Sequence, residues 1–269
     1  MLYPRRFAFL VRFADILTKK APSKSPADGR ENGHFVIHIL MKISLFAKDG
    51  VKISANLYPA AKQARYGASS VEKPIGWLVL IHMMPATKES WQNFAEKAQN
   101  EKYESIAVDL RGHGESKGGP DGFIHFTDEE HQKSIFDVQA TVDYLINSRG
   151  AAPAKIFLIG ASIGANLSLE YLAENPKFPA AVSLSAGLNY RGIKTEPLIK
   201  NFQAGQKIFF VSAKDNGDNA KENQKLYELT PNYVNKKIKI FNTGGHGTDL
   251  LKNNPNLENL IFEFLKSSA

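Results

Sequence analysis

The chain alternates between short apolar runs and longer stretches with helical periodicity from about residue 77 onward. WLVLIH (77–82) and KIFLIG (155–160) are typical of the apolar runs, whose residues are apolar on both faces except for one polar residue at an end. In SIFDVQATVDYLINS (134–148), by contrast, apolar residues recur at the spacing of one face of a helix. Strands that are apolar on both faces and alternate with amphipathic helices form a parallel sheet covered on both sides. The alternation therefore predicts an α/β fold.

The same pattern gives the order of the elements. The expected strands are 77–82, 105–110, 155–160, 180–186, 207–213 and 237–242, and the expected helices are 91–101, 134–148, 163–174, 219–229 and 256–266. Before them, polar and apolar residues alternate on both sides of Asp49-Gly50, which predicts an N-terminal β-hairpin. We expect one domain over residues 41–269, with a mostly parallel central sheet of about eight strands and helices on both faces.

Residues 1–40 differ from this domain in charge. They hold seven Lys and Arg against three Asp and Glu, so they supply +4 of the net charge of +7 and leave +3 for residues 41–269. Because most of the basic excess lies outside the domain, no nucleic-acid partner is expected. This basic extension is expected to be disordered or loosely helical. The alternatives are an amphipathic helix on a membrane surface and a targeting segment, because apolar residues recur at helical spacing in its first half.

Composition excludes several kinds of site. With no cysteine, the chain has no disulfide, no thiolate metal site and no Cys nucleophile. No apolar run approaches the roughly 18 residues that a membrane span requires. A cytoplasmic location is expected on these grounds, and the oligomeric state is left open.

Unusual residues follow the expected strands, where the functional groups of parallel sheets gather. These segments are HMMPAT (82–87), DLRGHGES (109–116), GASIGA (160–165), SAKDNGD (212–218) and GGHGTD (244–249). A Gly-x-Ser-x-Gly motif between strand and helix, followed along the chain by an Asp and then a His, resembles the α/β-hydrolase family. The resemblance covers residues 41–269 and is to compact esterases and dienelactone hydrolases, although the latter use Cys as the nucleophile.

Ser162 is the candidate nucleophile that this resemblance implies. A sharp strand-to-helix turn would project its hydroxyl from the sheet edge, beside the positive end of the following helix dipole. Gly160 and Gly164 have a steric reason to lack side chains if the turn is that tight. The alternative is that Ser162 only caps the helix.

A serine hydroxyl needs an adjacent base, and the base needs a carboxylate to fix its tautomer. His246 is the candidate base, because it follows a strand and lies in a glycine-rich loop. Asp215 aligns with the carboxylate of the family and is favoured, with Asp218 as the alternative. The family resemblance makes His82, His113 and Asp109 architectural.

The oxyanion of the tetrahedral intermediate needs two backbone donors. The resemblance implies the N–H groups of Ile163 and Met84, and Pro85 is excluded because it has no N–H. The family usually has Gly at the position of Met83, so a side chain there is a departure that narrows the expected acyl pocket.

Together these features predict a serine esterase that acts on a small-molecule ester, with no metal and no organic cofactor. The alternatives are a thioesterase or amidase that uses the same residues, and a non-catalytic binding protein of the same fold. The connection 187–206 is too short for a full lid domain, which predicts an open site. Phe123, Phe126 and Tyr190 border the pocket in this interpretation, or else pack within the core or on the surface.

Overall fold

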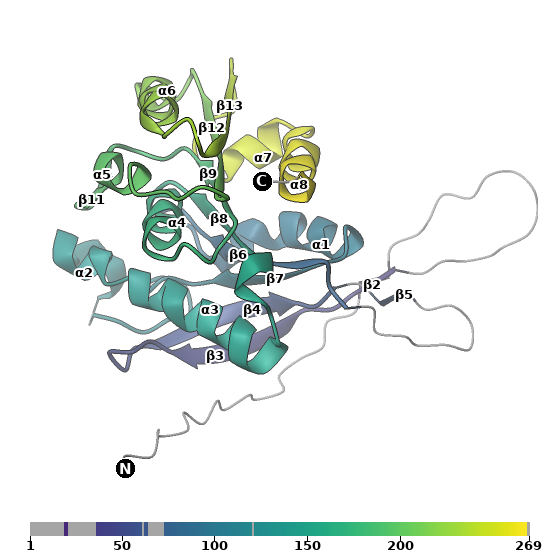
Figure 1. Ribbon diagram of the computed structural model, residues 1–269. Coiled ribbons are helices and arrows are strands. Elements are labelled where there is room, and N and C mark those ends of the chain that lie inside the picture. Colours follow the sequence, from purple (N-terminus) through teal and green to yellow (C-terminus); the bar gives the residue numbers. More distant parts are fainter. Residues whose placement is uncertain (1–18, 21–35, 61, 64–72, 120, 268–269) are drawn as a thin grey trace, which may run out of the picture.

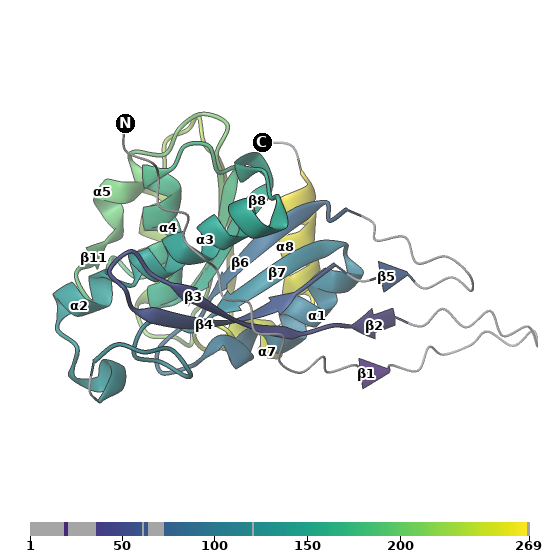
Figure 2. The ribbon, with the colours of Figure 1, turned by 90° about the horizontal axis from the view of Figure 1, so that it is seen from below.

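The computed structural model describes residues 19–20, 36–60, 62–63, 73–119 and 121–267. Two described segments of the basic extension are strands, β1 (Lys19–Lys20) and β2 (Val36–His38). They pair with each other, and β2 also pairs with β5 (Lys62–Gln63), in a small antiparallel sheet visible in Figure 2. The expected loose helix or disorder, and the expected membrane-binding or targeting segment, otherwise lie outside the described residues.

An eight-stranded sheet forms the centre of the domain (Figure 1). Its strands, in spatial order, are β13 (Asn235–Phe241), β12 (Lys207–Ala213), β9 (Ala180–Leu184), β8 (Ile156–Ala161), β6 (Gly76–Ile81), β7 (Tyr103–Val108), β4 (Lys52–Tyr58) and β3 (Met41–Phe46). The hairpin β3–β4 is antiparallel and β4 joins β7 antiparallel, whereas all other pairs are parallel. The predicted mostly parallel sheet with an N-terminal hairpin is confirmed.

Helices cover both faces of this sheet. The described α-helices are α1 (Gln92–Asn100), α2 (Asp128–Gln132), α3 (Ile135–Arg149), α4 (Ile163–Glu174), α5 (Thr195–Ile199), α6 (Asn219–Leu229), α7 (Asp249–Asn253) and α8 (Leu257–Lys266). Alternate residues of one strand belong to two separate cores: Val79 and Ile81 pack with α3, α4 and α6, whereas Leu78 and Leu80 pack with α1, α7 and α8. Figure 1 shows these two groups of helices on opposite sides of the sheet.

The connection between β9 and β12 has its own small elements. Residues 187–206 contain β10 (Asn189–Tyr190), which pairs with β11 (Ile193–Lys194), and then α5. Helix α5 packs against α4 and α6, at the side of the sheet. None of the described helices combines the length and the apolar character needed to cross a membrane.

Candidate functional site

Ser162 is the single residue between β8 and α4, and its backbone is strained. Its φ of 55° and ψ of −119° lie outside the regions that residues with a side chain normally occupy. Such strain persists only where the surrounding structure holds it, and it is common at functional sites. The Ser162 side chain makes no capping hydrogen bond to α4, so capping does not account for a serine here.

The two glycines of the motif allow this turn to be so tight. A Cβ atom on Gly160 would overlap the carbonyl oxygen of Gly164, and a Cβ on Gly164 would overlap the carbonyl oxygen of Ile81. The first turn of α4 therefore lies directly against the end of β6. This packing brings Ser162 next to the loop that follows β6, which contains Met83 and Met84.

His246 lies in the loop between β13 and α7. Gly244, Gly245 and Gly247 all have positive φ values, which only glycine adopts without cost. A Cβ on Gly247 would lie 3.4 Å from the Cβ of Ala161, the residue before Ser162. The loop thus brings His246 to the same end of the sheet as Ser162.

Side chains from two neighbouring strand ends hold this loop by its backbone. Asp215 accepts hydrogen bonds from the N–H groups of Gly244, at 2.9 Å, and Gly245, at 3.1 Å. The hydroxyl of Ser185 accepts a third from Gly247, at 3.0 Å. The two bonds to Asp215, that from Gly244 first, hold the pKa of this carboxyl below its usual value.

The imidazole of His246 is hydrogen-bonded to Asn216. The side-chain amide nitrogen of Asn216 lies 2.7 Å from Nδ1 of His246, and the Tyr190 ring meets the imidazole edge-on at 6.3 Å between centroids. In the described part of the chain, this imidazole is not hydrogen-bonded to Ser162 Oγ. Burial lowers the pKa of His246 below its ordinary value, and the charge of Asp249 opposes this shift only in part.

The expected contact between Asp215 and the imidazole is therefore corrected. Both Asp215 oxygens bond to the backbone of the loop that carries His246, and neither bonds to the ring. Asp218, the alternative, is exposed and forms an ion pair with Lys221 at 2.8 Å, just before α6. Asn216 was not predicted from the sequence, because a carboxylate is the expected partner of the base in a triad, although an amide can also orient an imidazole.

The loop after β6 is fixed by His82. Nε2 of this buried side chain accepts the N–H of Leu110, at 3.0 Å, so Nδ1 carries the proton and donates to the carbonyl of Met83, at 2.9 Å. Burial lowers the pKa of His82 to about 3, so the ring stays neutral. His82 thus links the segment that carries the candidate oxyanion donor Met84 to the end of β7.

The other candidate donor is Ile163, the first residue of α4. Its N–H has no acceptor within the helix, because the first N–H groups of any α-helix lack intrahelical partners. The side chain of Met84 packs against the core on the α4 face of the sheet. Met83 packs on the opposite core, and its sulfur would lie 2.5 Å from a Cβ on Gly247. Met83 therefore fills the space beside the loop that carries His246.

Residues 76–214 match the sequence profile of the alpha/beta hydrolase fold. The match spans just over half of the chain and includes Ser162 and its two glycines. The chain belongs to the α/β-hydrolase family. This membership confirms the resemblance drawn from the motif and the order of its elements.

Solved structures of other members have the same fold. This α/β hydrolase is similar to the Pyrococcus furiosus esterase Pf2001, with a TM-score of 0.67, 18% identity, and coverage of 84% of this chain and 92% of that one. It is also similar to the acetyl xylan esterase from Paenibacillus sp. R4 (TM-score 0.65, 10% identity, coverage 95% and 90%). The acylaminoacyl peptidase of Pyrococcus horikoshii gives a TM-score of 0.66, 14% identity and coverage of 86% and 42%.

One curated relative is much longer. The Multifunctional-autoprocessing repeats-in-toxin of Vibrio cholerae is 32% identical over 81 residues, which are 29% of this chain and 2% of the toxin. The matched segment is thus a very small part of the toxin.

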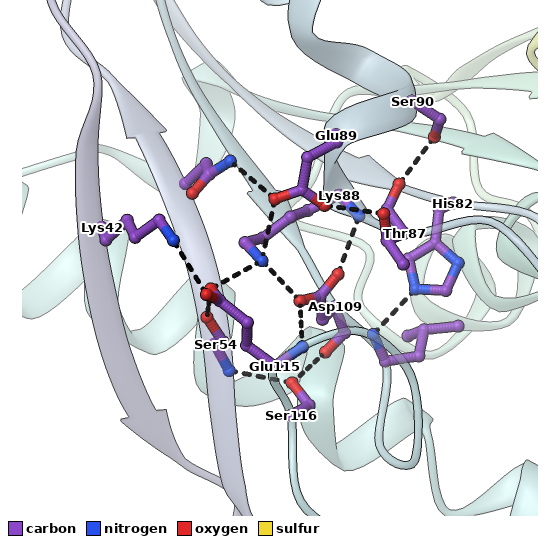
Figure 3. Close-up of polar contacts among 12 residues, drawn as sticks. Lys42, Ser54, His82, Thr87, Lys88, Glu89, Ser90, Asp109, Glu115 and Ser116 are labelled. Carbon is purple, nitrogen blue, oxygen red and sulfur yellow. Dashed lines mark hydrogen bonds and ion pairs between the residues drawn. The ribbon is translucent and has the colours of Figure 1, made fainter. Parts of the chain in front are cut away.

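A polar network surrounds the buried ion pair of Lys88 and Asp109 in this α/β hydrolase (Figure 3). Lys88 donates to Asp109 through its backbone N–H, at 2.8 Å, and through Nζ, at 2.6 Å, and Nζ also reaches Glu115. Although burial alone disfavours the ammonium, these carboxylates raise the pKa of Lys88 above its ordinary value. The network joins the segment after β6 to the loop after β7, which gives Asp109 the architectural role expected from the family.

The aromatic residues near the site divide into two groups. Phe123 stacks on His113 with ring centroids 3.9 Å apart, and Phe126 meets His131 of α2 edge-on at 5.3 Å, so both pack within the segment between β7 and α3. Tyr190 is the one of the three placed beside His246. Among the described residues, no cluster of His, Asp and Glu has the composition of a metal site.

Proposed function

We propose that this α/β hydrolase is a serine hydrolase that cleaves a small carboxylic ester. The observation that carries the proposal is the strained turn at Ser162, which lies beside the loop that carries His246. A residue with a side chain raises the free energy of the folded state when it adopts this backbone conformation. A role of Ser162 as the nucleophile of an acyl-transfer enzyme would explain why the strained conformation is kept.

In the proposed reaction, Ser162 Oγ attacks the carbonyl carbon of the ester while Nε2 of His246 takes the hydroxyl proton. The N–H groups of Met84 and Ile163 stabilise the resulting oxyanion. His246 then donates its proton to the departing alkoxide, which leaves an acyl group on Ser162. Water, deprotonated by the same imidazole, attacks this acyl-enzyme and releases the acid.

Asp215, the carboxylate predicted for the triad, acts in this proposal through the backbone. It holds Gly244 and Gly245, and through them it fixes the loop from which His246 projects. The acidic member of the predicted triad thus anchors the loop, with each of its two carboxylate oxygens accepting one backbone N–H.

An ester is proposed as substrate because two proteins of similar structure, the Pyrococcus furiosus and Paenibacillus proteins, are esterases. An amide is the second candidate, since the acylaminoacyl peptidase shares the fold. Because the connection 187–206 carries only a short hairpin and α5, we propose a site that is open to soluble substrates.

We expect the purified chain to hydrolyse p-nitrophenyl esters, and acetyl and butyryl esters faster than dodecanoyl esters, because Met83 occupies space beside the site. The same acyl groups should be offered as thioesters and as p-nitroanilides, and release of the leaving group followed by absorbance. Faster hydrolysis of an anilide than of the matching ester would favour an amidase. Hydrolysis of none of the three classes would favour a non-catalytic binding protein.

A further inference from the structure

Asn216 is held in a defined position beside His246. Its backbone N–H donates to the carbonyl of Ala213, at 3.3 Å, and its own carbonyl accepts from Asn219, at 3.1 Å. The side chain is half-buried and reaches His246 Nδ1 at 2.7 Å. A turn fixed at both ends thus presents an uncharged amide to the nitrogen that a carboxylate usually contacts.

Among the described residues, the charged and titratable groups around the imidazole do not take the place of this amide as its hydrogen-bond partner. Asp215, on the same loop, directs both carboxylate oxygens at Gly244 and Gly245. Asp249, on α7, is exposed and interacts with the ring through its charge alone. Tyr190, from β10, meets the ring by its edge, and burial raises its pKa to about 12, so it is neutral.

We propose that Asn216 is the positioning residue that orients the His246 imidazole, while the neighbouring Asp215 holds only the backbone of the loop. This inference rests on the proposed function, in which His246 is the general base. Two consecutive residues thereby divide the work that one carboxylate performs in a Ser-His-Asp triad.

An amide and a carboxylate have different consequences for the imidazole. When Asn216 directs its amide nitrogen at Nδ1, the imidazole proton is on Nε2, and the ring cannot accept the Ser162 proton there. Rotation of the amide by about 180° brings its oxygen to the same place. Nδ1–H then donates to that oxygen, and the Nε2 lone pair is available to Ser162. A carboxylate accepts only, so it would enforce this second, reactive tautomer.

The test is the pKa of His246, measured by NMR titration of imidazole resonances that a His246→Gln variant assigns. An Asn216→Asp variant places a negative charge at Nδ1, so it should raise this pKa by about one unit or more. Asp215→Asn is the matched control, and it should leave the pKa of His246 nearly unchanged because Asp215 does not contact the ring. The opposite pattern, a lower pKa in Asp215→Asn and no increase in Asn216→Asp, would overturn the proposal.

Kinetics give a second readout. We expect Asn216→Ala to lower kcat for ester hydrolysis by about tenfold or more, and Asn216→Asp to raise kcat and to move the acidic limb of the kcat/KM profile to higher pH. Full kcat in Asn216→Ala would contradict the inference. Since the NMR titration needs no substrate, it also separates the two proposals: a chain that hydrolyses nothing contradicts the proposed function, and the titration still decides the role of Asn216.

Discussion

A Ser162→Ala variant is expected to retain less than about one ten-thousandth of the wild-type kcat for ester hydrolysis. The substitution removes the atom that forms the acyl-enzyme, and it leaves only the oxyanion donors and substrate binding. The fold should survive, because the Ser162 side chain makes no capping hydrogen bond to α4. The small side chain of alanine also adds less steric strain at this position than a larger side chain would.

Initial rates with a p-nitrophenyl ester measure this loss. Ser148→Ala is the matched control, since Ser148 is an exposed serine near the end of α3, and it should keep wild-type kcat. A Ser162→Ala variant whose kcat stays within tenfold of the wild type would contradict a nucleophilic role for Ser162.

A Gly160→Ala variant is expected to lose about 3 kcal/mol or more of its free energy of unfolding. The added Cβ would overlap the carbonyl oxygen of Gly164 and lie 2.5 Å from the hydroxyl of Ser168. The first of these atoms is backbone in the opening turn of α4, so no change of rotamer relieves the overlap. The strand-to-helix turn must therefore open, and Ser162 moves with it.

Urea unfolding followed by circular dichroism gives the free energy for this variant and for its control, Gly150→Ala. Gly150 ends α3 with a φ of 69°, and a Cβ there meets no atom within 4 Å. The control should thus lose only the roughly 1–2 kcal/mol of a side chain in left-handed backbone. Equal losses in the two variants would show that the turn at Gly160 is not as tight as the structure has it.

The long, periodic elements were predictable from the sequence. Helices α4 and α6 and strand β12 have the bounds that periodicity predicted. Helix α4 and strand β12 are buried along nearly their whole length, whereas α6 buries only Asn219, Asn223 and Leu226. Strand β9 is shorter than predicted and ends at Leu184. The next residue, Ser185, has a φ of 58°, and its hydroxyl holds the loop of His246. A tertiary contact thus ends this strand, and no local pattern could indicate it.

Short elements were missed for a different reason. Helices α2 and α5 have five residues each, too few to show a helical period. For α2 a local signal did exist: Thr127 and Glu130 form a capping box, whose spacing is visible in the sequence. No comparable signal precedes α5, which is stabilised by packing on α4 and α6.

In the site, too, features set by neighbouring residues could be predicted from the sequence, and features set by tertiary contacts could not. The turn at Ser162 could be predicted because its constraints, Gly160 and Gly164, are two residues away on each side. The partner of His246 could not, because the choice between Asp215 and Asn216 depends on how two distant loops meet. The position of Met83 likewise depends on tertiary structure, since its side chain packs against Gly247.

Covalent labelling is the most direct test of the central claim that Ser162 is an activated nucleophile. The intact protein is incubated with a fluorophosphonate, and the modified residue is located by peptide mass spectrometry. We predict a single phosphonylated residue, Ser162, with no adduct in Ser162→Ala and much slower labelling in His246→Ala. A folded wild-type chain that takes up no label, or that is labelled on another serine, would contradict the account.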